Sequence, residues 1–194
     1  MERATKLSGH DLINIGIFGA IYFVIVCVIS MLGIVPVFLP LLAVLMPIIG
    51  GIPFMLFLTK VKKPGMIFIM AIMMGLLMVL TGMGMWSLLT SAIAGLIAEI
   101  VFKSGNYASA KKAVLTYGFF SLWMYGNYMS LFLDREQYFA QRASFGKAYA
   151  EAVAQLLPNW MAFVLLIVCF ICGILGGLFG QKVLKKHFEK AGLV

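Results

Sequence analysis

Few residues of this 194-residue chain have side chains suited to chemistry, and the first candidates stand near its start. His10 and Asp11 are adjacent in the stretch "SGHDLINIGIFGA" (8–20), a pairing that a proton-transfer site would use. Ser8 and Asp11, however, have the S-x-x-[DE] spacing that caps the start of a helix, where a carboxylate also suits the positive end of the helix dipole. The spacing therefore favours a helix entrance over catalysis.

Cysteines and one carboxylate are the next candidates. Cys169 and Cys172 have C-x-x-C spacing, but they stand in the apolar run "LLIVCFICGILGG" without other ligands, so we interpret them, with Cys27, as small core residues. Glu99 lies in another apolar run, about one helical turn before Lys103. An intramembrane carboxylate suggests function. At this depth it can also reach the interface or pair with a lysine, which favours a structural or partner-contact role over proton coupling.

Motifs of known enzyme classes are missing from the sequence. It contains no G-x-x-x-x-G-K-[ST] loop, no H-E-x-x-H and no G-x-S-x-G, and its two histidines, His10 and His187, stand at opposite ends of the chain. We therefore expect no enzymatic activity, no metal site and no cofactor.

The composition indicates a membrane protein. Hydrophobic residues make up 63% of the chain and charged residues only 11%, against about 25% charged residues in ordinary soluble domains. Runs of about 20 apolar residues are long enough to cross a bilayer. They predict an all-α integral membrane protein, one transmembrane domain over 1–194, with six spans near 12–33, 36–58, 65–82, 85–102, 113–133 and 160–180.

Lysine and arginine predict the orientation of the spans, because their excess marks cytoplasmic loops. Twelve of the 15 flank the predicted spans on one side, including Arg3 and Lys6 before the first span and Lys190 near the end. The other three share the loop after the fifth span with acidic residues. Both termini are therefore predicted to be cytoplasmic. The net charge of +8 follows from this topology and from attraction to anionic lipid, and needs no nucleic acid partner.

The loop at 134–160 is the long connection on the predicted outer side, between the fifth and sixth spans. Its second half alternates apolar and polar side chains with helical periodicity, which predicts an amphipathic helix. The apolar members are Tyr149, Val153, Leu156 and Leu157, and the polar members are Lys147, Glu151 and Gln155. This helix either closes a cavity as a lid or lies on the membrane surface, and the sequence leaves both open.

Asn127, in "LWMYGNYMSLF", stands about two thirds of the way through the predicted span 113–133. An amide there is costly unless it bonds to a neighbouring helix or to a ligand, and both roles stay open. Trp86, Tyr138 and Trp160 are candidate interface anchors. Methionines crowd into 66–85, mostly as flexible packing, but those of the turn "TGMGMW" stand where they could close over an apolar or aromatic ligand.

Three stretches carry a resemblance to a known family. "KLSGHDLINIGIFGAIYFVI", "PLLAVLMPIIGGIPFMLFLTKVKKPG" and "MGMWSLLTSAIAGLIAEI" resemble the Trep_Strep group, also described as MptD-type, of the substrate-binding S components of energy-coupling factor importers. The likeness extends over nearly the whole chain. It implies a six-helix subunit of the bacterial plasma membrane that works with a transmembrane coupling protein and two ATPase subunits.

The resemblance also implies two sites. The A-x-x-x-A motif with which the family's first helix contacts the coupling protein corresponds to Gly16 and Ala20, with Gly19 adjacent and with glycine replacing the first alanine. The family binds its ligand near the outer face. By that analogy the ligand-binding candidates are Met83, Met85, Trp86, Asn127, Tyr128 and Asn159.

Substrates of such subunits are vitamins, vitamin precursors or metal ions. The Met, Trp, Tyr and Asn side chains on the predicted outer side suit an organic molecule. A flat vitamin-like heterocycle is the first expectation and haem is the second.

Two other functions stay open from the sequence. The chain could be a membrane scaffold whose polar residues only pack helices, or a stand-alone carrier, although it lacks the broken spans with ionisable groups that carriers use.

Overall fold

The computed structural model describes residues 6–192, and every regular element in that range is helical, with 3-10 helices written η. In chain order the elements are α1 (Gly9–Ser30), η1 (Met31–Ile34), η2 (Pro36–Phe38), α2 (Leu39–Leu58), α3 (Met66–Leu80), α4 (Trp86–Lys103), α5 (Ala110–Phe120), η3 (Ser121–Met124), α6 (Tyr125–Leu133), α7 (Arg135–Ala140), η4 (Ala143–Phe145), α8 (Lys147–Leu156), α9 (Met161–Val183) and α10 (Lys185–Ala191). Arg3 lies outside the described residues.

The lengths of these helices agree with the predicted spans in part. Between residues 6 and 192, four helical stretches are long and apolar enough to cross a membrane: Gly9–Ile34, Pro36–Leu58, Trp86–Lys103 and Met161–Val183. The all-α membrane class is confirmed, whereas the count of six spans stays a prediction. The remaining two predicted spans differ from single long helices.

α3 is shorter than the predicted span 65–82 because glycines end it on both sides. Gly65 and Gly82 adopt positive φ angles of 94° and 82°, a left-handed geometry that glycine takes without steric cost. The helix between them therefore has only 15 residues.

The predicted span 113–133 is divided into α5 and α6 by the tighter turn η3. Such a break leaves backbone carbonyls in need of donors, and inside a membrane those donors must come from protein. The Thr90 hydroxyl of α4 donates to the carbonyl of Trp123 at 3.0 Å, and the Ser121 hydroxyl donates to the carbonyl of Gly118 in α5 at 2.8 Å. Hydroxyls at the helix contacts thus stabilise the irregular backbone.

α2 and α9 make the most extensive helix contact of the described residues, and glycines allow it. A Cβ atom added at Gly176 would collide with the Pro47 carbonyl oxygen, and one added at Gly51 would collide with Gly176 itself. Small residues that let two backbones approach are typical of helix packing in membranes. Cys169 and Cys172 are buried in this part of α9, in agreement with their interpretation as core residues.

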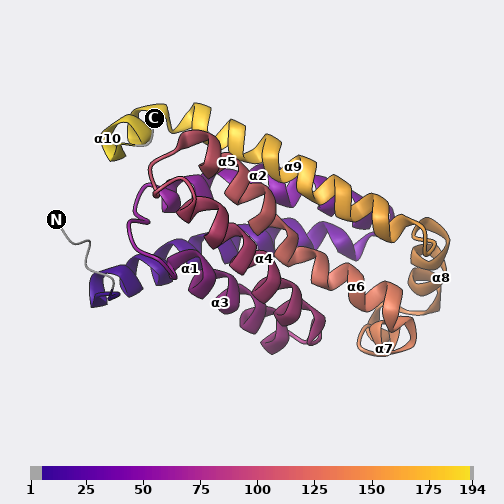
Figure 1. The fold of residues 1–194 in the computed structure, drawn as a ribbon. Coiled ribbons are helices and arrows are strands. Elements are labelled where there is room, and N and C mark those ends of the chain that lie inside the picture. The colour runs from indigo at the N-terminus through magenta and orange to yellow at the C-terminus, as the bar shows by residue number, and fades with distance from the viewer. Residues whose placement is uncertain (1–5, 193–194) are drawn as a thin grey trace.

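The two ends of the helix bundle differ in composition. Figure 1 shows the start of α1 and the C-terminal α10 at one end, and α7 and α8 at the other. We call the first the basic end, because the lysines of the α2–α3, α4–α5 and α9–α10 connections lie there, and the second the cavity end. That the basic end faces the cytoplasm remains a prediction.

The basic end contains the helix cap that the sequence predicts. The Asp11 N–H donates to the Ser8 hydroxyl at 3.4 Å, and the Ser8 N–H donates to the Asp11 carboxylate at 2.7 Å, which confirms the capping box. Lys63 pairs with the same carboxylate at 2.6 Å and so joins α1 to the α2–α3 connection. His10 instead lies 3.2 Å from the Asn14 side chain, so the two adjacent residues contact different partners.

Glu99 has partners that the sequence did not indicate. Only 7% of the residue is exposed. Its carboxylate accepts hydrogen bonds from the N–H groups of Ile67 and Phe68 at 3.0 and 3.3 Å and from the Tyr107 hydroxyl at 2.8 Å. The first N–H groups of a helix have no hydrogen-bond acceptor within that helix. The Glu99 carboxylate of α4 is the acceptor for two such N–H groups of α3. The residue therefore caps a neighbouring helix instead of reaching toward the interface.

Candidate functional site

The segment from α7 to α8 covers the cavity end. Asp134 begins it by accepting a hydrogen bond from the N–H of Gln137 at 3.3 Å, and Gly146, with φ 84°, precedes α8. α8 is amphipathic as predicted: Tyr149 and Val153 are buried, and the predicted polar face is exposed. The prediction was wrong for Leu156, which is 39% exposed, because the helix ends there and the next residue, Leu157, turns inward.

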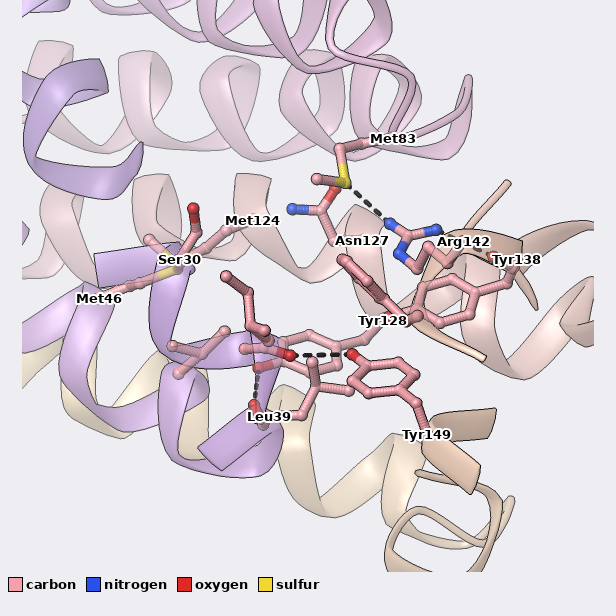
Figure 2. Close-up of a pocket in the computed structure, with 14 residues that line it drawn as sticks. Ser30, Leu39, Met46, Met83, Met124, Asn127, Tyr128, Tyr138, Arg142 and Tyr149 are labelled. Carbon is pink, nitrogen blue, oxygen red and sulfur yellow. Dashed lines mark hydrogen bonds between the residues drawn. The ribbon is translucent and has the colours of Figure 1, made fainter. Parts of the chain in front are cut away.

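A cavity of about 140 Å³ lies beneath this segment. Its walls come from the end of α1 with η1, the start of α2, the α3–α4 turn, η3 with α6, and the covering segment itself (Figure 2). Its lining residues are Ser30, Gly33, Ile34, Leu39, Leu42, Met46, Met83, Met124, Asn127, Tyr128, Tyr138, Arg142, Phe145 and Tyr149. No histidine, cysteine or carboxylate is among them, so the side chains suit an organic molecule better than a metal ion.

Two tyrosine hydroxyls fix the walls of the cavity (Figure 2). Tyr149 of α8 donates to the carbonyl of Gly33 at 2.9 Å, and Tyr128 of α6 donates to the carbonyl of Leu39 at 2.8 Å. Gly33 needs this donor, because the residue three positions later is Pro36, which has no N–H. Burial raises the pKa of Tyr149 to about 12, so its hydroxyl stays protonated and able to donate well into the alkaline range.

Asn127 lies between two neighbouring helices and the cavity. Its side-chain oxygen accepts a hydrogen bond from Ser87 of α4 at 2.7 Å, and its nitrogen lies 3.8 Å from the sulfur of Met78. The interhelical bond that the sequence left open is therefore present. Since Asn127 also lines the cavity, contact with a ligand stays a prediction.

Arg142 brings a positive charge to the cavity wall. Its Nη1 atom donates to the carbonyl of Tyr138 at 3.1 Å, its guanidinium carbon lies 3.8 Å from the centre of the Tyr138 ring, and its Nη2 atom lies 2.8 Å from the sulfur of Met83. Sequence reasoning does not single out Arg142, because nothing local distinguishes it from the other charges of the loop. The one available signal is its spacing of four residues from Tyr138, which suits a cation–π contact on one helical turn.

The six predicted ligand-binding residues fall into three places. Met83, Asn127 and Tyr128 line the cavity. Met85 and Trp86 line a neighbouring pocket of about 290 Å³, which shares Tyr138 with the cavity. Asn159 lines neither. It is exposed, and its side-chain oxygen accepts a hydrogen bond from Arg135 at 3.3 Å. The structure thus brings together half of the predicted set, and it adds the tyrosines and the arginine of the covering segment.

The predicted docking residues of α1 do not share one face. Gly16 and Ala20 are exposed, and a Cβ atom added at Gly16 would meet nothing within 4 Å. Gly19 is buried, and a Cβ atom there would collide with the end of the Met73 side chain on α3. Because one helical residue turns the chain by about 100°, Gly19 faces the bundle and serves its internal packing. Gly19 is therefore removed from the predicted docking strip.

Comparison with known protein families gives a match over nearly the whole chain. The model of a hypothetical bacterial integral membrane protein family, Trep_Strep, matches residues 9–190. The chain belongs to this family. No curated protein and no solved structure matches it. Membership of the Trep_Strep family agrees with the apolar helices described above and places the chain among integral membrane proteins.

Proposed function

We propose that this chain is the substrate-binding S component of an energy-coupling factor importer, a multi-pass protein of the bacterial plasma membrane. It captures a small organic molecule from outside and passes it to a coupling protein and two ATPase subunits. The observation that carries the proposal is the cavity beneath α7 and α8, at the end of the bundle opposite the basic end. By the positive-inside rule that end faces outward.

The size of the cavity bears on the substrate. An apolar cavity of about 150 Å³ holds one benzene molecule, whereas typical ligand pockets measure about 300–1,000 Å³. At about 140 Å³ the cavity suits a single ring with a small substituent. A vitamin-like heterocycle is therefore favoured, and haem would require the covering segment to move away.

The exposed face of α1 supports the proposed docking to a coupling protein. Gly16 and Ala20 stand one helical turn apart among exposed apolar side chains, including Ile13 and Ile17. Glycine and alanine at this spacing let a second membrane helix approach closely.

An enzymatic role is not part of the proposal. The side chains around the cavity include neither a carboxylate nor a histidine that could act as a general base. The hydroxyls of Tyr128 and Tyr149 are engaged with backbone carbonyls.

Copurification and uptake test the proposal together. The wild-type chain is expected to copurify with ATPase subunits from its native membrane and to release one stoichiometric small molecule, identified by mass spectrometry. Gly16→Leu should abolish copurification and uptake while leaving the bound molecule in place, because Gly16 is remote from the cavity. Val28→Leu, on an exposed residue of the same helix, is the matched control and should change neither.

Three outcomes would contradict parts of the proposal. Normal copurification and uptake by Gly16→Leu would show that the docking surface lies elsewhere. Uptake in a host without any ATPase partner would indicate a stand-alone carrier. Repeated recovery of an empty protein from varied growth media would favour a scaffold.

A further inference from the structure

Two nitrogen donors at the cavity face sulfur atoms instead of oxygen acceptors. Arg142 Nη2 lies 2.8 Å from the Met83 sulfur, and Asn127 Nδ2 lies 3.8 Å from the Met78 sulfur. A thioether is a weak acceptor, whereas a guanidinium forms its strongest hydrogen bonds with carboxylate or phosphate oxygens. Both donors are therefore only weakly satisfied by the protein.

The charge of Arg142 has no counter-ion among the residues that the structure describes. Among residues 6–192, no carboxylate lies within 4.0 Å of its guanidinium, which instead contacts the carbonyl and the ring of Tyr138 and the Met83 sulfur. The side chain is half-buried beside an apolar cavity. A cation in such surroundings is stabilised when an anion joins it.

The polar and apolar parts of the cavity lie on different sides. Figure 2 shows Met83, Asn127 and Arg142 together at one wall, while Met46 and Met124 lie across the cavity from Arg142. A molecule with a charged group at one end and an apolar body at the other fits this division. Met83 can give way to it, because methionine side chains are flexible.

We propose that the substrate is an organic anion, a single apolar or aromatic ring carrying a carboxylate. Its carboxylate displaces the Met83 sulfur and accepts hydrogen bonds from Arg142 and from the Asn127 amide, while the ring occupies the apolar side of the cavity. The inference rests on the proposed capture function and names the chemical class of the substrate. It makes Arg142 the residue that selects acids over neutral analogues of the same shape.

Matched acids and amides test the inference on the purified full-length chain in lipid nanodiscs. The probes are benzoate with benzamide and nicotinate with nicotinamide, each pair titrated by calorimetry at neutral pH. The wild-type protein is expected to bind each acid about 10- to 100-fold more tightly than its amide, which is the range for hydrogen bonds to a charged group.

Variants assign the preference to particular residues. Arg142→Gln should abolish the preference for acids, and Arg142→Lys should keep part of it. Lys147→Gln removes a positive charge from an exposed position of the same covering segment and should leave the preference unchanged. Asn127→Asp keeps the acceptor for Ser87 and places a negative charge in the wall, so it should reject acids even if Arg142→Gln fails to fold.

The outcomes separate this inference from the importer function. Equal binding of acids and amides, no binding of either acid, or a preference that persists in Arg142→Gln would each overturn the inference. Equal binding together with normal uptake of another molecule would leave the importer function standing. The expected preference in a chain that neither copurifies with ATPases nor supports uptake would keep the inference and refute the importer function.

Discussion

The basic end and the cavity end of the bundle use buried polar side chains for different purposes. At the basic end, the Glu99 carboxylate receives three hydrogen bonds from α3 and Tyr107, all at ordinary distances. At the cavity end, Arg142 Nη2 and Asn127 Nδ2 each face a sulfur atom. Polar groups with strong partners inside the chain hold the fold, whereas polar groups with weak partners are available to a ligand.

The largest effect is expected at the basic end. Glu99→Ala would leave two backbone N–H groups and the Tyr107 hydroxyl without their acceptor in a buried place. We expect a loss of about 3 kcal/mol in the free energy of unfolding and a fall of about 5–10 °C in the melting temperature in detergent. Glu189→Ala, an exposed carboxylate near the same end, is the control and should melt like the wild type. If the Glu99→Ala protein had unchanged stability but defective uptake, Glu99 would serve transport and not the stability of the fold.

An intermediate effect is expected from Tyr149→Phe at the cavity end. The variant leaves the Gly33 carbonyl without a donor and removes one link between α8 and η1. We expect a loss of about 1–2 kcal/mol and amide hydrogen exchange that is about 10-fold faster in residues 135–157.

Tyr125→Phe is the matched control for that prediction. Its hydroxyl donates to the Ala162 carbonyl at 2.8 Å, a bond of the same kind between α6 and α9 that lies away from the cavity. It should destabilise the protein without changing exchange in the covering segment. If both variants accelerated exchange there equally, the Tyr149 bond would have no special part in holding the segment over the cavity.

The parts of this structure that depend on local sequence could be predicted, because the information lies within a few residues. The capping box needs only Ser8 and Asp11, three positions apart, and it is present. The amphipathic pattern of α8 needs one helix, and it failed only at Leu156, where the helix ends. The apolar runs gave the membrane class, but glycine geometry at Gly65 shortened one predicted span.

The parts that depend on tertiary contacts could not be predicted. Glu99 caps a helix start 32 residues away in sequence, and Arg142 meets a methionine 59 residues away. Neither the contact of Glu99 with α3 nor that of Arg142 with Met83 can be predicted from a single sequence. Gly19 shows the same limit at closer range, because small-residue spacing does not tell which small residues face the bundle and which face outward.

The smallest effect is expected for the ion pair between Asp11 and Lys63. Asp11→Asn keeps an acceptor for the Ser8 N–H but removes the charge, and an ion pair in contact with water contributes little. We expect the melting temperature to change by no more than about 2 °C, and the difference to vanish in 1 M salt, where charges are screened within about 3 Å. Lys63→Gln should behave alike, and the double variant should be no worse than either single one. A cost equal to that of Glu99→Ala would mean that charge, and not the buried cap, holds the basic end together.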